Sequence, residues 1–473
     1  MGRRPRERSS LDARWRGRAT LAVVAVVVSM LCGWSAAALD GAFSHPRAAP
    51  GLRSFSVDAT PGLISSSCAG GRTVSSSLFS RYVSPPFDSA PVAQETSNGV
   101  TVVAVSGATA PDSTILLRAF LPSCEPDRAF GKAGSETVNV RLGSEALPNI
   151  VITSAAPGPA DSIILAGSSD DGMFVGMIDA DGRIEHDFGA NGWARLPWQG
   201  EPTALVREPS GDIVVAVRDG EDCCEVEFLG QISATGIVLE SFGATGRAVL
   251  PDYSTGPEGA QVTQLARADN GDLLVVSTGG HMGALASVVS EFTSDGRSVT
   301  AFDRNMEAES SLLPSVFVGG VLVRPGGFLL VGAGQAGPIG PAPEPSAAGQ
   351  LLPFDDDGRL LGWLGGSGAS EFSSNVYWNV WAFPRPSGGY LMVAASTPYL
   401  SATPAPQRVE VVALTGSGSV DPSYADRGYG SFSLPASSGS FVPVSATSSG
   451  HAVAVVWINA GDAGSLELTE VNL

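Results

Sequence analysis

Two short acidic segments are similar in composition to cation-binding loops. They read Asp179-Ala-Asp-Gly182 and Asp355-Asp-Asp-Gly358, and clustered carboxylate oxygens are the ligands that Ca²⁺ prefers. Neither segment has the glutamate that completes a calcium loop, and the equivalent positions elsewhere hold Ser233-Ala-Thr-Gly236 and Thr415-Gly-Ser-Gly418. We therefore expect ordinary hairpin turns, in which glycine supplies a positive φ, and not a metal site.

The sequence contains neither a cluster of histidines nor a known nucleophile motif. His45, His186, His281 and His451 lie far apart, so a shared metal would have to gather them from distant segments. We expect His186 and His281 in loops and His451 at the beginning of a strand. Neither a Gly-x-Ser-x-Gly elbow nor a His-Glu-x-x-His motif occurs. The sequence predicts no catalytic residue, no metal ligand and no cofactor.

The elements that carry these residues recur along the chain. Glycine (58) and proline (33) are abundant and only 16% of residues are charged, which indicates short strands joined by tight turns. A glycine, or a residue in its place, precedes an apolar strand at intervals of about 60 residues, as expected for a repeat protein. The seven positions are Gly99, Asp161, Gly211, Gly271, Gly327, Gly388 and Gly450.

A second landmark keeps the same period. An aromatic or large apolar residue follows each Asp-Gly-type turn, usually with a glycine-rich turn directly after it, and we expect this residue to fill the space between neighbouring units. The six positions are Phe130, Phe188, Phe242, Phe302, Leu364 and Tyr424. Between landmarks each unit reads as four short antiparallel strands, for example residues 203–208, 213–218, 225–233 and 246–251, which form the blade of a β-propeller.

The chain has seven glycine-type positions that precede a strand but only six aromatic or large apolar positions. This difference indicates that one unit lacks its own fourth strand and receives it from another part of the chain. The chain ends at residues 466–473 in what matches a third strand, and residues 71–79 resemble the fourth strands of other units. We predict that these segments pair and close the ring, because closure removes an exposed sheet edge. The predicted fold is an all-β, seven-bladed propeller over residues 71–473.

The order of turns resembles that of a known repeat. An Asp-Gly turn such as Asp181-Gly182 is followed by Phe188-Gly-Ala-Asn-Gly192 and then by Pro209-Ser-Gly211. This pattern resembles the delta-60 repeat, a bacterial β-propeller repeat, over about residues 71–473, although the units around Phe302 and Leu364 depart from it. The resemblance implies a propeller in an exported or cell-envelope protein, and the family has no common catalytic residues to carry over.

An aromatic segment, Tyr377-Trp-Asn-Val-Trp-Ala-Phe383, falls where the first strand of a unit should line a central channel. Indole rings there could stack on sugars. Strand alternation would place Trp378 with Val380 on one face and Tyr377 with Trp381 on the other. At least one face must pack between units, so we favour a packing role.

Four cysteines follow the N-terminal segment: Cys68, Cys124, Cys223 and Cys224. An even number in an exported chain favours disulfides, and three pairings are possible. On the propeller, Cys68 and Cys124 fall in loops of the two blades that meet where the ring closes, so a bond between them would clamp the seam. Cys223 and Cys224 lie in an acidic loop, which disfavours a reactive thiolate.

The N-terminus has the composition of an export signal. Residues 1–18 are arginine-rich, residues 19–39 are apolar, and Ala36-Ala-Ala38 offers a cleavage site. The apolar segment is also long enough to span a bilayer, so cleavage after export and membrane anchoring are both compatible with the sequence. In either case residues 1–18 stay cytoplasmic, residues 40–70 form a linker, and the propeller is extracytoplasmic.

The net charge limits the partners that the folded part of the chain can bind. The formal net charge is −19, and the basic N-terminus leaves the rest of the chain more acidic still, which disfavours nucleic acid and anionic lipid as partners of the folded part. We expect a monomeric binding or scaffold module for a protein or glycan at the cell envelope, in contact with the membrane only through an uncleaved N-terminal helix. The alternative is a propeller enzyme, a polysaccharide lyase or hydrolase or a quinoprotein-like oxidoreductase, that uses the central funnel.

Overall fold

The structure is a computed structural model of the whole chain. It describes residues 74–75, 92–106, 114–121, 126–219, 226–250, 260–281, 284–310, 316–336, 346–361, 377–385, 388–396, 408–424, 428–433, 438–446, 452–460 and 463–471. Contacts divide the chain into Met1–Val57 and Asp58–Leu473, and all described residues belong to the second unit. Residues 19–39, His45, His451 and the four cysteines Cys68, Cys124, Cys223 and Cys224 therefore lie outside the described residues.

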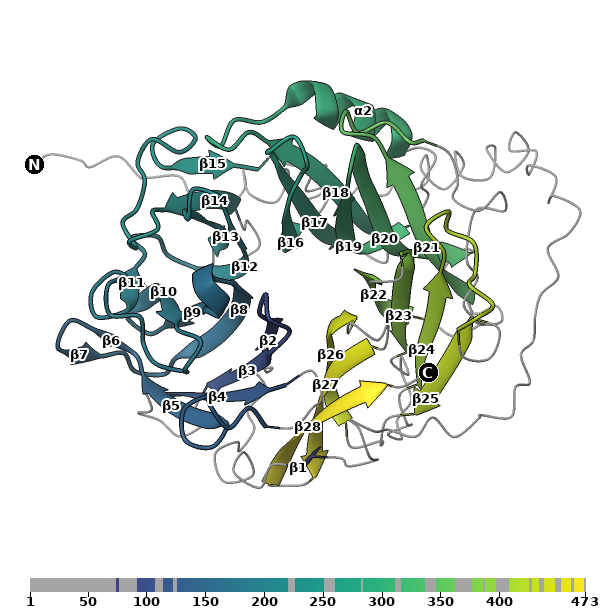
Figure 1. The fold of residues 1–473 in the computed structure, drawn as a ribbon. Coiled ribbons are helices and arrows are strands. Elements are labelled where there is room, and N and C mark those ends of the chain that lie inside the picture. The colour runs from purple at the N-terminus through teal and green to yellow at the C-terminus, as the bar shows by residue number, and fades with distance from the viewer. Residues whose placement is uncertain are drawn as a thin grey trace, which may run out of the picture. The chain divides into compact units, whose positions relative to one another are not determined.

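The described chain is built mainly from antiparallel sheets (Figure 1). Sheet 1 contains β2 (Val92–Glu95), β3 (Thr101–Ser106), β4 (Thr114–Phe120) and β5 (Ser135–Asn139). Sheet 2 contains β8 (Val151–Pro157), β9 (Ile163–Ser169), β10 (Gly172–Ile178) and β11 (Trp193–Arg195). Sheet 3 contains β12 (Glu201–Arg207), β13 (Ile213–Asp219), β14 (Val226–Ile232) and β15 (Arg247–Val249). All three pair antiparallel in chain order, as the sequence predicts.

The second half of the chain continues the pattern. Sheet 4 contains β16 (Ala260–Arg267), β17 (Leu273–His281) and β18 (Ala284–Phe292). Sheet 5 contains β19 (Val316–Arg324), β20 (Gly327–Ala336) and β21 (Ser346–Phe354). Sheet 6 contains β22 (Tyr377–Pro384), β23 (Tyr390–Ser396), β24 (Arg408–Leu414) and β25 (Tyr429–Ser433). Sheet 7 contains β26 (Ser438–Ala446), β27 (Ala452–Ala460) and β28 (Ala463–Val471), joined by β1 (Val74–Ser75).

Three short elements lie outside these sheets. A small hairpin is formed by β6 (Arg141–Leu142) and β7 (Glu145–Ala146), and a 3-10 helix covers Pro159–Asp161. Helix α2 covers Thr300–Ser310. None of the helices within the described residues is long and apolar enough to cross a membrane.

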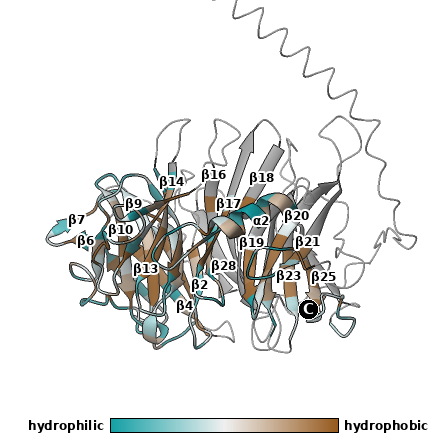
Figure 2. Cartoon of the chain, turned by 90° about the horizontal axis from the view of Figure 1, so that it is seen from above, coloured by the Kyte–Doolittle hydropathy of each residue, from teal (hydrophilic) through white to brown (hydrophobic). Residues whose placement is uncertain are grey.

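The first landmark of the sequence marks the same place in six sheets. Each of the six described positions lies at the beginning of the second strand of its sheet or in the turn before it, and Gly450 lies outside the described residues. Asp161, which replaces glycine, has a φ of +63°, close to the +82° of Gly99. The second strands that follow are buried on both faces, as β3 is along its whole length, because each sheet packs between two others. Figure 2 shows the hydrophobic residues concentrated in these strands.

The first strands of the sheets contact one another in sequence order. β2 contacts β8, β8 contacts β12, and the series continues through β16, β19 and β22 to β26, which contacts β2. In Figure 1 these strands lie on the inner side of the ring of sheets. The predicted pairing of the two ends of the folded region is present, since β1 pairs antiparallel with β28 and places Val74 opposite Leu468.

The second landmark is buried at its five described positions, and Leu364 lies outside the described residues. Phe130 of sheet 1 is buried, and a Cβ on Gly182 in the next sheet would lie 2.8 Å from its ring. Beside this contact, the backbone N–H after the phenylalanine donates a hydrogen bond to the turn of the next sheet, an arrangement we term the inter-sheet clamp. The three such bonds are Gly131 to the carbonyl oxygen of Asp181, Gly189 to that of Thr235, and Gly243 to that of Asp295.

The unit around Phe302 differs from the prediction of four strands. The residues that should form a glycine turn are instead the helix α2. Elsewhere this turn needs positive φ values, such as +57° at Gly189 and +89° at Gly192, whereas the equivalent residues here are Asp303 and Met306. These residues accept helical geometry, and Asp303 in the first turn favours it. Phe302 itself remains buried.

Candidate binding site on the first strands

The first strands share a local irregularity. In β8, β12 and β16 the pairing with the second strand shifts by one residue, between Ile152 and Ser154, Pro202 and Ala204, and Val262 and Gln264. A β-bulge of this kind bends a strand and re-aims its side chains. Backbone groups beside a bulge can bond to the neighbouring sheet. The N–H of Ile152 in β8 donates a hydrogen bond of 2.8 Å to the hydroxyl of Ser106 in sheet 1.

A cavity of about 450 Å³ opens along β2, β8, β12 and β16, within the range of roughly 300–1,000 Å³ that small-ligand sites occupy. Its polar side chains are Gln94, Ser154, Thr203, Arg207 and Gln264. Its walls are otherwise small or aliphatic. Among the described residues that line it there is no carboxylate and no histidine, so Arg207 is its one charged group.

Two polar groups in this cavity lack partners. The hydroxyl of Thr203 and the Nε of Arg207 are buried without a hydrogen bond, and Arg207 has no ion-pair partner among the described residues. The amide of Gln264 is fully used, since it accepts from the N–H of Val321 at 2.7 Å and donates to the carbonyl oxygen of Val321 at 3.1 Å. Buried polar groups without partners are uncommon in folded proteins. Both atoms are inaccessible to solvent, so a ligand in the cavity that these residues line would reach them only after a rotation of the side chain.

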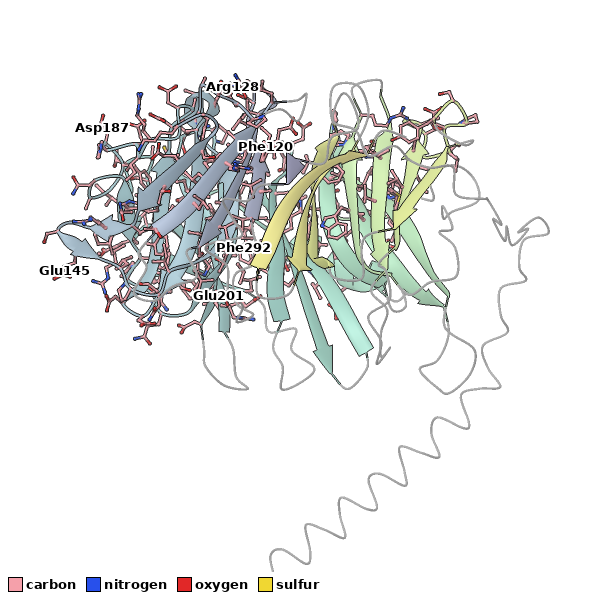
Figure 3. All side chains as sticks on the ribbon, turned by 90° about the horizontal axis from the view of Figure 1, so that it is seen from below. Phe120, Arg128, Glu145, Asp187, Glu201 and Phe292 are labelled. Atoms are coloured by element: carbon pink, nitrogen blue, oxygen red, sulfur yellow. The ribbon has the colours of Figure 1, made fainter. Side chains whose placement is uncertain are left out.

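A second cavity of about 450 Å³ lies between sheets 2 and 3. Asp179, Asp181, Glu185 and Asp187 line it, together with Phe188. Arg207 lines both cavities, and its Nη2 lies near Gly211, which lines the second. In Figure 3, Asp187 lies at the same edge of the sheets as Arg128, whereas Glu201, at the beginning of β12, lies at the opposite edge. Arg207, at the end of β12, therefore stands beside an acidic face.

The next sheet contains a residue equivalent to Arg207. Arg267 ends β16 as Arg207 ends β12, and each pairs with the residue that begins the second strand. Arg267 forms an ion pair with Glu208 of the preceding sheet, and the Glu208 side chain is only 5% exposed. Buried carboxylates are almost always paired in this way.

A different buried carboxyl lies in sheet 4. Glu291 on β18 is 3% exposed and accepts a hydrogen bond from the Asn270 amide at 3.0 Å. The pKa of Glu291 is raised to about 7, chiefly by burial. The hydrogen bond from Asn270 lowers this pKa, whereas the negative charges of Asp272, Asp356 and Asp303 raise it further. A perturbed carboxyl in a cleft would be a candidate acid or base, but Glu291 lines neither of these two cavities.

The acidic segments form turns, as expected. The Asp179 carboxylate accepts hydrogen bonds from the backbone N–H groups of Asp181 and Arg183, at 3.0 and 2.7 Å. Asp355 does the same for Asp357 and Arg359. Within the described part of the chain no group of three or more His, Cys, Asp or Glu residues could hold a metal ion.

Two sequence expectations need correction. His281 does not lie in a loop but is the last residue of β17, whereas His186 is exposed between strands as expected. The aromatic segment does form the first strand of sheet 6, β22, but its pairing shifts between Tyr377 and Asn379. This bulge interrupts the simple alternation from which the two faces were assigned.

The residues of the first cavity were not identified from the sequence. Gln94, Ser154 and Thr203 belong to no motif, and the bulges beside Ser154 and Thr203 are not visible in a hydrophobic pattern. One signal was present: an arginine ends the first strand of three successive units, at Arg207, Arg267 and Arg324, but only Arg267 is preceded one unit earlier by an acidic residue, Glu208.

Comparisons with known proteins give distant likenesses. No protein-family model matches the chain, and no curated protein matches it in sequence. Similar solved structures include the polysaccharide lyase Uly1 (11% identity, TM-score 0.44, 83% of this chain and 91% of that chain) and the extracellular domains 1–2 of Drosophila Semaphorin 1b (11%, 0.42, 81% and 86%). A third is the Penicillium chrysogenum alpha-L-arabinanase complexed with arabinobiose (12%, 0.37, 83% and 95%). At these values none assigns an activity or a ligand to this chain.

Proposed function

We propose that this chain is an exported cell-envelope protein whose seven-bladed β-propeller, closed by β1, binds a glycan in the cavity along the first strands. Support for seven blades comes from the closed series of contacts between first strands and from the pairing of Val74 with Leu468. Export is supported by the composition of residues 1–39. The ligand class rests on the cavity alone.

The observation that carries the proposal is the type of side chain in that cavity. Hydroxyl and amide groups of Gln94, Ser154 and Thr203 both donate and accept hydrogen bonds, as sugar hydroxyls do. Glycosidic hydrolysis needs two carboxylates, one on either side of the bond that is cut, whereas the described lining of this cavity contains none. The chemistry present there is that of binding.

The test is a glycan array probed with the purified, labelled protein, followed by titration calorimetry with the glycan that gives the highest signal. The Thr203→Val variant keeps the shape of the side chain and removes its unpartnered hydroxyl. We expect it to weaken glycan binding by roughly 1 kcal/mol or more while leaving the unfolding temperature unchanged or higher, since no internal hydrogen bond is lost.

A matched control is Thr235→Val in the exposed turn of sheet 3, outside the first cavity. It should leave glycan binding unchanged. Absence of any array signal, or equal binding by wild type and the Thr203→Val variant, would contradict a glycan site in this cavity.

A further inference from the structure

One position of the third strands is ionisable in sheet 4 and neutral in five other sheets. Its backbone carbonyl oxygen accepts a hydrogen bond from the segment after the next turn, as Met177 accepts from Glu185 and Glu291 accepts from Val299. The equivalent residues are Ala119 in sheet 1, Gln231 in sheet 3, Pro353 in sheet 5 and Ala413 in sheet 6. In sheet 7 the side chain at this position, Glu470, lies outside the described part of the chain. A buried carboxyl is thus described here in the sheet whose glycine turn is replaced by α2.

Helix α2 contacts β18 (Figure 1) and bonds to it at this same position. In sheet 2 the N–H of Met177 donates to the carbonyl oxygen of Gly192, in the glycine turn, at 3.2 Å. In sheet 4 the backbone of Glu291 bonds instead to the carboxylate of Asp303 on α2. The Ser298 hydroxyl donates to the same carboxylate, at 2.8 Å. The Asp303 carboxylate therefore holds α2 to β18 at the residue that carries the buried carboxyl.

The groups that face Glu291 are carboxylates from three further elements. Asp272 directly precedes β17, Asp303 belongs to α2, and Asp356 lies in the turn after β21. Besides burial, which has the largest effect, the negative charges of all three raise the pKa of Glu291. The amide of Asn270 lowers this pKa by its hydrogen bond and brings no positive charge.

The cations on the neighbouring elements have other partners. Arg267 pairs with Glu208, Arg297 with Asp295 and Arg359 with Asp357, whereas Arg304 bonds to the carbonyl oxygen of Thr300 in its own helix. Of the described residues, no cation is among the groups that act on the pKa of Glu291. A bound proton is therefore what neutralises this carboxyl group.

We infer that α2 is a pH-sensitive element, which packs on β18 while Glu291 is protonated and opens more often when Glu291 is ionised. Ionisation adds a second negative charge beside Asp303, in a place where burial makes the repulsion between like charges strong. Opening lets water reach both carboxylates. It also exposes Phe302 and Met306, which are buried in the core, so the packed state remains the major one.

The direction of the effect follows from proton binding. Glu291 has a pKa of about 7 in the packed state, and contact with water in the open state returns it toward the ordinary 4.5. The packed state holds the proton more tightly, so a rise in pH favours the open state. Between about pH 4.5 and 7 the ratio of open to packed molecules should rise by up to about tenfold for each pH unit. Neither Glu291 nor α2 lines the two cavities, so the inference stands apart from the proposed glycan function.

Hydrogen exchange of the purified full chain, followed by mass spectrometry from about pH 5 to pH 8, measures this opening once the intrinsic pH dependence of exchange is removed. We expect the protection of the amides in Thr300–Ser310 to fall by up to about tenfold per pH unit up to about pH 7. At each pH these amides should exchange faster than those of β9, because α2 opens without unfolding of sheet 2. Equal exchange of the two segments would mean that α2 opens only in global unfolding, and would overturn the inference.

Matched variants identify the titrating group. Glu291→Gln still accepts the hydrogen bond from Asn270 and cannot ionise, so the protection of α2 should become independent of pH. The exposed Glu240→Gln should keep the wild-type dependence. If the Glu291→Gln variant fails to fold, Asp303→Asn decides: it retains an acceptor oxygen and removes the neighbouring charge, and should narrow the pH range over which protection falls. A wild-type dependence in the Glu291→Gln variant, or in Asp303→Asn where that variant is used, would overturn the inference.

Discussion

The side-chain amide of Asn305 donates a hydrogen bond of 2.7 Å to the backbone carbonyl oxygen of Asp357. In the inter-sheet clamp the donor to this turn carbonyl is the backbone N–H of a glycine, as in Gly131 to Asp181. Helix α2 has replaced the glycine turn, yet a group on it reaches the same acceptor in the next sheet. The link between neighbouring sheets is thus kept while the local structure changes.

Asn305→Asp tests this link, because the carboxylate has the same shape and cannot donate. It should destabilise the protein by about 1–3 kcal/mol, since the carbonyl oxygen of Asp357 loses its donor and faces a negative charge. Urea unfolding would measure the change. Arg304→Ala on the same helix, whose Nε bonds only within the helix, serves as a control and should cost less. An equal effect of both variants would contradict the role of Asn305.

The packing of phenylalanine on glycine can be separated from backbone strain. Gly182 and Gly388 have φ values of +83° and +84°, but only Gly182 lies against a phenylalanine, whereas nothing lies near a Cβ on Gly388. Gly388→Ala should cost about 1–2 kcal/mol for the left-handed backbone alone. Gly182→Ala should cost about 1–3 kcal/mol more, because its Cβ would overlap Phe130. If urea unfolding showed that both variants lose the same amount of stability, the contact between Gly182 and Phe130 would not be tightly packed.

Glu291 predicts a pH dependence of stability. Its folded pKa of about 7 lies above the ordinary 4.5, so the folded state holds the proton more tightly than the unfolded state does. Stability should therefore be full below about pH 4.5 and fall as the pH rises toward 7, by up to roughly 3 kcal/mol. Glu291→Gln should remove this slope.

Urea unfolding at several pH values, compared between wild type and variant, would show the difference. The exposed Glu240→Gln is a suitable control and should keep the wild-type slope. A Glu291→Gln variant with an unchanged slope would show that the buried carboxyl is not the source.

Closure by β1 can be tested by truncation. A protein that begins after residue 79 lacks the partner of β28 and should expose the edge around Leu468, which favours association between molecules. We expect a lower unfolding temperature and light scattering that grows with protein concentration. A protein that begins at residue 70 retains β1 and should behave like the longer chain. If both truncations behave alike, β1 does not close the ring.

Features that depend on local chemistry could be predicted from the sequence. The turn at Asp179 follows from a short polar side chain next to a glycine, and the burial of Phe130 follows from its recurrence. The closing pair of Val74 and Leu468 followed from counting units. In each case the residues that determine the feature are close in sequence or repeat at a fixed spacing.

Features that depend on contacts between distant segments could not be predicted in the same way. Arg267 pairs with Glu208, about 60 residues earlier, and only the placement of sheets 3 and 4 brings them together. The bulge beside Asn379 arises within a continuous apolar pattern. Helix α2 formed where two glycines were lost, and the sequence showed the loss without showing what replaces the turn.

The inter-sheet clamp joins backbone atoms, so it does not depend on which side chains the turns carry. Its acceptor residue is aspartate at Asp181 and Asp295 and threonine at Thr235, and the bond is the same. Side chains on this face, including those around the second cavity, can therefore change in evolution at little cost to assembly. A scaffold of this kind can therefore acquire new ligands unit by unit.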